Sequence, residues 1–167
     1  MTHFRAGRAL IATAAVAALA TACSSGSGGS AHPSGPAPHD APGRVTVRAP
    51  GVDLTITDAV VHVLPSGAGT LTMTVHHGDG VPEHLAMVAT PGGGRGTLTG
   101  APKGTDGMMT SAGVLLPADS TVTFGRGKGP GIALEKVPDG TSAHTLPLLL
   151  EFGVARLVRL SAIVSSY

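Results

Sequence analysis

Histidine and methionine are the side chains of this 167-residue sequence whose chemistry is most distinctive. The chain has a single cysteine, Cys23, and the residues after it include seven histidines and four methionines, namely His32, His39, His62, His76, His77, His84, His144, Met73, Met87, Met108 and Met109. Imidazole nitrogen and thioether sulfur are donors that suit Cu(I). A blue-copper electron carrier needs a cysteine sulfur as well, which no residue after Cys23 supplies. The composition therefore favours soft-metal binding over redox copper chemistry.

Several of these side chains have a structural interpretation. Met73 alternates in phase with Leu71 and Val75, and Met87 follows Leu85 in phase, so we expect both methionines in the core. His76 and His77 end a predicted strand before Gly78, where hydrogen bonding at a turn is an alternative to metal binding.

Met108 and Met109 lie in a loop-like setting, where exposed methionines need a reason. The substitute metal set that we consider combines Met108 and Met109 with His77 or His84. His32 and His39 would join it from the upstream segment, or would be solvated there.

No constellation typical of an enzyme is present. The sequence lacks a Gly-x-Ser-x-Gly elbow, a phosphate-binding glycine loop and a His-Glu-x-x-His helix. The scattered carboxylates are interpreted as solvated charges, and Asp58, within an apolar run, is the one that stands out. We expect no enzymatic activity.

Charge and aromatic content argue against nucleic acid as a partner. Eleven Lys and Arg balance ten Asp and Glu, so no basic surface is predicted for phosphates. Phe4, Phe124, Phe152 and Tyr167 are the complete set of aromatic residues, too few for a stacking platform.

The N-terminal residues 1–22 are typical of a bacterial export signal. Arg5 and Arg8 precede a 12-residue, mainly apolar run at 9–20, which is shorter than the roughly 20 residues that span a membrane. The segment ending in Cys23, Leu-Ala-Thr-Ala-Cys, resembles a lipobox. We therefore expect Cys23 to be acylated and to anchor the protein on the extracytoplasmic face of the cell membrane, with palmitate as one of the attached chains.

Residues 23–43 form the next unit. The stretch is rich in Gly, Ser, Pro and Ala and has no apolar periodicity, so we expect a disordered tether that carries His32 and His39. Removal of Arg5 and Arg8 leaves nine basic against ten acidic residues, so attachment to the membrane must come from the lipid.

Residues 44–167 are expected to fold as one domain. Leu71, Met73 and Val75 alternate with threonines, and similar runs recur at roughly ten-residue spacing between Gly- and Pro-containing turns. No segment has convincing helical periodicity. The pattern predicts an all-β fold, an antiparallel β-sandwich or small barrel.

Residues 69–164 resemble the PCu(A)C family of periplasmic copper chaperones. The matching stretches are Leu-Thr-Met-Thr-Val at 71–75, Val-Ala-Thr-Pro at 88–91, Met108-Met109, Gly-Val-Leu-Leu-Pro-Ala-Asp-Ser-Thr-Val-Thr-Phe at 113–124, and a closing hairpin at 146–164. The resemblance implies a cupredoxin-like β-sandwich that carries Cu(I) and delivers it to an oxidase copper centre.

The family's copper motif is His, ten residues, Met, twenty-one residues, His, one residue, Met. With the first Met on Met109, the other three positions fall on Leu98, Gly131 and Ala133. With Met108 they fall on Thr97, Pro130 and Ile132. Neither register keeps more than one ligand, so this chain departs from the pattern.

Two functions remain open from the sequence. One is Cu(I) binding through the substitute set, with delivery to an extracytoplasmic copper protein. The other is a non-metal structural or interaction module of the cell envelope, whose partner would be a membrane complex.

Overall fold

The computed structural model describes residues 41–137 and 144–166, which contain strands and no helix. The expected signal peptide, Cys23 and all but the last residues of the expected tether lie outside the described residues. The strands are β1 (Val45–Ala49), β2 (Val52–Val63), β3 (Gly69–His77), β4 (Glu83–Ala89), β5 (Thr97–Thr99), β6 (Met109–Thr110), β7 (Gly113–Leu116), β8 (Ser120–Phe124), β9 (Gly131–Leu134), β10 (Thr145–Phe152) and β11 (Leu157–Ser166).

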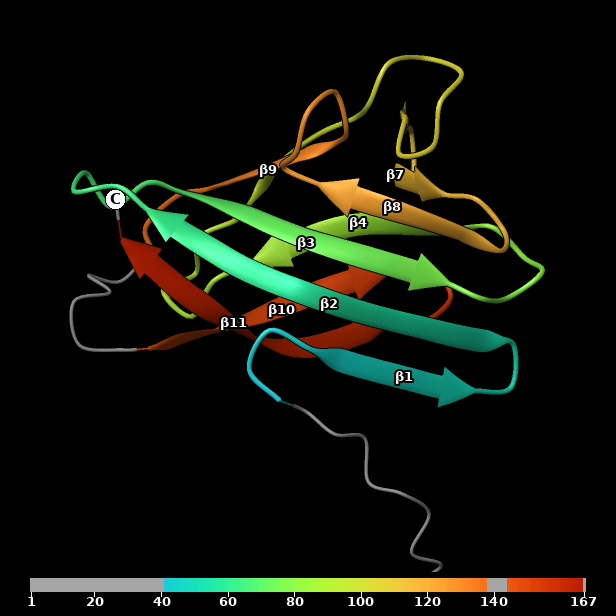
Figure 1. The fold of residues 1–167 in the computed structure, drawn as a ribbon, viewed down its shortest axis with the longest axis horizontal. Helices are drawn as coiled ribbons and strands as arrows, with labels where there is room; N and C mark the ends of the chain where they lie inside the picture. The colour runs from blue at the N-terminus through green and yellow to red at the C-terminus, as the bar shows by residue number, and fades with distance from the viewer. Residues whose placement is uncertain (1–40, 138–143, 167) are drawn as a thin grey trace, which may run out of the picture. The chain divides into compact units, whose positions relative to one another are not determined.

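The strands form one 11-stranded sheet that folds back on itself (Figure 1). Its order is β5-β9-β3-β2-β11-β10-β4-β7-β6, with β1 paired to β2 and β8 paired to β3. An isolated bridge between Ala101 and Met108 joins the segment after β5 to the residue before β6. The two ends of the sheet therefore meet, and the fold is a nearly closed barrel. The expected all-β class is confirmed.

The predicted antiparallel arrangement holds for every strand pair except one. Strand β11 runs parallel to the second half of β2, from the Ile163–Val60 pair to the Ser166–Val63 pair. The first half of β2 pairs instead with β1. One edge of this long strand thus borders two different neighbours, while β3 pairs along its other edge.

A bulge around Asp58 makes this exchange of neighbours geometrically feasible. The register between β2 and β3 shifts between Thr57 and Val60, and Asp58 has a left-handed backbone with φ of 53°. The Ala59 N–H donates to Gly43 O at 3.1 Å. Bulges bend a strand and increase its twist, so Asp58, which stood out in the sequence, marks the point where β2 changes its partner.

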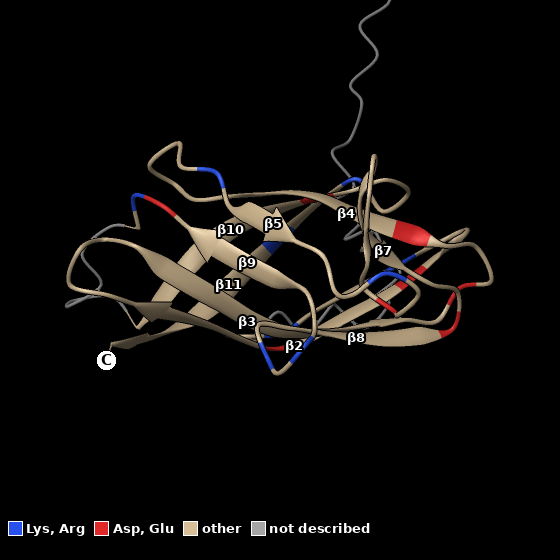
Figure 2. Ribbon diagram, turned by 90° about the horizontal axis from the view of Figure 1, so that it is seen from above, with Lys and Arg blue, Asp and Glu red and all other residues tan. Residues whose placement is uncertain are grey.

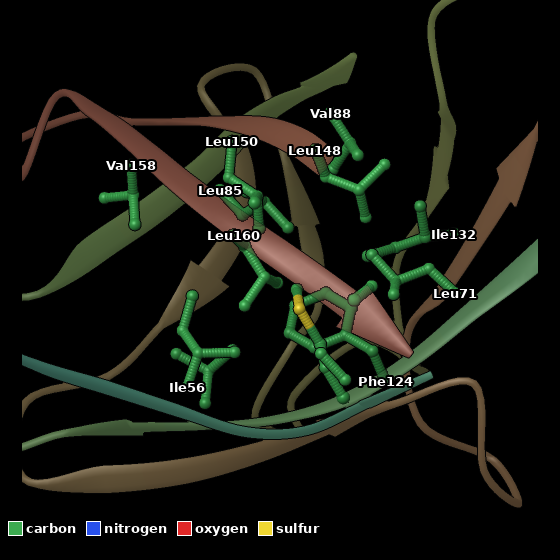
Figure 3. Close-up of a cluster of buried hydrophobic side chains, with 14 of the residues drawn as sticks. Ile56, Leu71, Leu85, Val88, Phe124, Ile132, Leu148, Leu150, Val158 and Leu160 are labelled. Atoms are coloured by element: carbon green, nitrogen blue, oxygen red, sulfur yellow. The ribbon is translucent and has the colours of Figure 1, made fainter. Parts of the chain in front are cut away.

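The core lies between the two walls of the folded sheet (Figure 3). Ile56, Leu71 and Phe124 from one wall approach Leu85, Leu148 and Leu150 from the other, and all six side chains are buried. Burial of one such side chain contributes about 1.5–3 kcal/mol. Because no cysteine follows Cys23, this burial stabilises the domain without a disulfide.

The two expected core methionines differ in their outcome. Met73 is 1% exposed, which confirms its prediction. Met87 is only half-buried, because Glu151 pairs with Met87 whereas Phe152 pairs with Leu85. The extra residue, Ala86, reverses the alternation of β4, so Met87 lies on the outer face and the prediction of a core position was wrong.

Charged residues are spread over turns and strand ends on several sides of the domain (Figure 2). No helix long and apolar enough to cross a membrane occurs in the part of the chain that the structure describes.

Candidate metal centre

Met108 and Met109 lie at the seam where the two ends of the sheet meet. Besides the bridge to Ala101, Met108 O accepts a hydrogen bond from Leu115 N at 3.0 Å, and Gly107 N donates to Leu115 O at 3.0 Å. The sequence had suggested a loop-like setting for the methionine pair. The structure instead places the pair at a hydrogen-bonded edge of the sheet.

Two glycines allow the chain to approach itself closely at this seam. A Cβ at Gly100 would collide with the backbone of Met109. Gly107 has φ of +80°, and a Cβ there would lie 2.8 Å from the Pro130 ring. Only residues without a side chain fit these positions, so the sequence holds the methionines against the start of β9.

Met108 and His84 share a cross-strand row. Leu115 donates its backbone N–H to Met108 O, one residue before the Met109–Val114 pair of β6 with β7, and it pairs with His84 of β4. Their Cα atoms are thus two strand spacings apart, about 10 Å. Residues in one row project from the same face of a sheet. Both side chains are half-buried and lie on the face opposite to buried Leu85 and Val114.

Met109 and His77, the other two candidates, do not join this row. Met109 pairs with Val114, so it alternates away from Met108, and it is 44% exposed. His77 lies on β3 in the other wall and is 4% exposed. Its Nδ1 is 3.1 Å from the carbonyl oxygen of Pro117, an acceptor, so Nδ1 is the protonated nitrogen.

The structural interpretation of the His76–His77 pair agrees with these contacts. His76 is exposed and its Nδ1 lies 3.0 Å from Thr121 Oγ1 on β8, while His77 binds the segment just before β8. Both imidazoles thus connect the end of β3 to its neighbouring chain.

The positions of the PCu(A)C copper motif come together but carry no donor groups besides methionine. Strand β5 pairs with β9 so that Leu98 faces Ile132 and Thr99 faces Gly131. Leu98 packs partly against the core, whereas Gly131 and Ala133 alternate outward from buried Ile132 and Leu134. Gly131 and Ala133 are the second His position and the last Met position of the motif when its first Met is placed on Met109. Apolar side chains and a glycine cannot bind a metal ion, so the residues present at these positions do not fit copper.

Within residues 41–137 and 144–166, no group of three or more His, Cys, Asp or Glu residues could hold a metal ion. In the described part of the chain, the row of Met108 and His84 brings a thioether and an imidazole to one surface.

Glu83 is a buried polar residue that sequence reasoning missed. It is 1% exposed, and its carboxylate accepts hydrogen bonds from the N–H groups of His84, Val154 and Ala155 at 2.7–3.0 Å. The interpretation of all carboxylates as solvated charges was wrong here. An acidic residue beginning an apolar strand after Pro82 was the available signal. Its role is structural, since it fixes the β10–β11 turn beside His84.

Comparison with known proteins supports the fold. No protein-family model matches the chain, and no curated protein matches it. The solved structures that are similar include three PCuAC domains. The copper-bound PCuAC domain from PmoF2 is 18% identical with a TM-score of 0.56, over 68% of this chain and 93% of that domain. The apo PCuAC domain from PmoF1 is 20% identical with a TM-score of 0.57, over 68% and 94%.

The apo PCuAC domain from PmoF2 gives the same result, with 17% identity and a TM-score of 0.55 over 74% of this chain and 94% of that domain. At these identities the similarity establishes the architecture. The chain has a PCuAC-like, cupredoxin-like β-fold, as its resemblance in sequence had predicted.

Proposed function

We propose that this protein is an exported, lipid-anchored Cu(I)-binding protein that delivers copper to an extracytoplasmic copper protein. Met108 and His84 would be the protein ligands, on the outer face of β6, β7 and β4. The observation that carries the proposal is their common cross-strand row, at the seam of a PCuAC-like fold.

The chemistry of the two side chains supports this assignment. A thioether and an imidazole are suitable donors for Cu(I), and in the part of the chain that the structure describes neither side chain is engaged in a hydrogen bond. The side chain that lies between them, Leu115, is apolar and cannot compete for the metal. Half-burial of both donors limits access of water while leaving one side open for transfer of the ion.

Two donors alone bind Cu(I) weakly, so further ligands belong to the proposal. Met87 lies on the same outer face of β4 as His84 because of the Ala86 bulge, whereas Met109 alternates away from this row. His32 and His39 are the candidates from the upstream segment. Weak binding agrees with a carrier that must release its cargo.

A Cu(I) titration of the mature chain against a chromogenic competitor tests the proposal. We expect stoichiometric binding that falls at least tenfold in Met108→Leu and in His84→Gln, with His76→Gln as the matched control on β3. A third variant, His32→Ala with His39→Ala, measures the contribution of the upstream histidines. Absence of binding by the unmodified chain would contradict the proposal.

A second candidate function is favoured by a different observation. Because Leu98, Gly131 and Ala133 occupy the family's copper positions, the domain could serve as a non-metal interaction module of the cell envelope. This function predicts no Cu(I) binding, no effect of Met108→Leu on activity in cells, and co-purification with a membrane complex.

A further inference from the structure

An open groove of about 520 Å³ lies on the outer face of β4, β10 and β11. Its volume is within the range of small-ligand sites, roughly 300–1,000 Å³. Its apolar floor and its cationic rim are formed mainly by Ala89, Pro91, Pro147, Leu149, Arg44 and Arg159.

The strand registers explain why these residues meet. Leu149 on β10 pairs with Ala89 on β4 and with Arg159 on β11, so the three form one cross-strand row. The alternate residues Leu148 and Leu150 are buried in the core, which leaves the row on the outside.

Arg44 reaches the same groove from the start of the domain. The Gly43 N–H donates to Ser161 O on β11 at 2.6 Å, and this bond places Arg44 near the row that contains Arg159. Two guanidinium groups therefore border one apolar floor, although they are 115 residues apart in sequence.

Neither arginine is neutralised by an acidic partner in the described part of the chain. The ion pair found there joins Arg48 to Asp53 on β1 and β2. Glu151 shares the outer face of β10, but it pairs with Leu157 and Met87, one row beyond Arg159. Guanidinium groups bind phosphate and carboxylate through paired N–H donors, so the groove is complementary to an anion with an apolar body.

The position where the upstream chain enters the domain indicates which anion this is. Ala41 lines the groove, and 17 residues lie between it and Cys23. A chain of that length reaches about 60 Å at most. If Cys23 carries the lipid, the groove is held close to the bilayer surface.

We infer that the groove binds the headgroup phosphate of an anionic phospholipid through Arg44 and Arg159, with the apolar floor against the glycerol and upper acyl region. This inference rests on the membrane anchor of the proposed function. It adds the orientation that the domain would take on the membrane. The loop between β5 and β6 and residues 41–44 lie on opposite sides of the domain (Figure 1). Headgroup binding would thus turn the Met108 seam away from the membrane, toward a copper-accepting partner.

Vesicle binding by the mature chain with Cys23→Ser tests the inference without the acyl anchor. The two kinds of vesicle are phosphatidylcholine alone and phosphatidylcholine mixed with phosphatidylglycerol. We expect binding to the mixed vesicles alone, and a loss of about thirtyfold in the double variant Arg44→Gln with Arg159→Gln. That factor corresponds to about 1 kcal/mol for each basic residue at an anionic surface.

The matched control is Arg126→Gln with Lys128→Gln, which removes the same charge from the β8–β9 turn. Leu149→Glu, which places a carboxylate opposite Arg159, should abolish binding while thermal unfolding shows that the domain remains folded. Equal losses in the groove and control variants would mean non-specific attraction and would overturn the inference. Binding of inorganic phosphate without vesicle binding, or no binding at all, would also overturn it.

The copper proposal is judged separately, because the Cu(I) titration uses variants of the seam. Loss of vesicle binding with intact Cu(I) binding would reject the lipid site alone.

Discussion

Both carboxylate oxygens of Glu83 accept a hydrogen bond from the backbone N–H of Val154, at 3.0 and 2.9 Å, across 71 residues of sequence. The same carboxylate also accepts the N–H groups of His84 and Ala155. A single buried acidic side chain therefore connects the start of β4 to the β10–β11 turn, next to the proposed ligand His84.

Replacement of this carboxylate should destabilise the domain. Hydrogen bonds to a charged group are worth about 1.5–3 kcal/mol, and Glu83→Ala removes several of them at once. We expect a loss of about 3 kcal/mol in the free energy of unfolding, measured by chemical denaturation, and a smaller loss in Glu83→Gln. Glu151→Ala, at an exposed position of β10, is the control. Equal effects of the Glu83 and Glu151 variants would contradict the structural role.

The left-handed conformation of Asp58 makes a second prediction. A β-branched residue is strongly disfavoured at a φ of 53°, whereas glycine adopts it freely. Asp58→Val should lower the free energy of unfolding by about 2 kcal/mol, and Asp58→Gly should change it by less than about 1 kcal/mol. Asp106→Val, in an exposed turn without a positive φ, serves as the comparison. An unchanged stability in Asp58→Val would show that the bulge is not required.

A substitution at Gly113 should affect both the stability of the fold and the seam that contains Met108. It has φ of +124°, and a Cβ there would lie 2.9 Å from Ala86 Cα on β4. Gly113→Ala should therefore separate β7 from β4, lower the unfolding temperature and weaken Cu(I) binding through Met108 and His84 together. Gly80→Ala is the matched control, because a Cβ at Gly80 meets no atom within 4 Å. A variant Gly113→Ala with normal stability would refute the close approach.

The sequence predicted those features that depend on regular alternation. The phase of Leu71, Met73 and Val75 determines the buried face of β3, and the all-β class follows from many such runs. The prediction from the sequence failed where a single residue changes the phase of the inward–outward alternation. The bulge at Ala86 moved Met87 outward, because one inserted residue exchanges the faces of a strand and leaves no compositional signal.

The candidate site was predicted only in part for a similar reason. Methionines in a Gly-rich segment indicated a special setting, but the choice between His84 and His77 depends on which strands become neighbours. That information is not local, since β4 reaches β6 only through β7. The sequence likewise could not predict that Arg44 and Arg159 border one groove. The hydrogen bond from Gly43 N to Ser161 O on β11 brings them together.

Restoring the family's motif should create a copper site on this scaffold. Gly131 and Ala133 project outward from β9 beside the methionine seam, and a Cβ at Gly131 would meet nothing closer than Thr99 Cβ at 3.9 Å. A side chain can therefore begin at Gly131 without displacing the backbone, and Ala133 is exposed. We expect the double variant Gly131→His with Ala133→Met to gain Cu(I) affinity by at least a hundredfold in a competitor titration, because an imidazole and a second thioether would join Met109.

The control for this gain is Gly131→Ser with Ala133→Ser, which adds side chains without soft donors. Adding Met109→Leu to the restored variant should remove most of the gained affinity, whereas Met108→Leu should leave it, because the two methionines alternate to different faces. If Met108→Leu and Met109→Leu reduced the gained affinity equally, the assignment of Met109 to the motif and of Met108 to the His84 row would be wrong. A different loss for each methionine would instead distinguish the restored site from the proposed native one within a single chain.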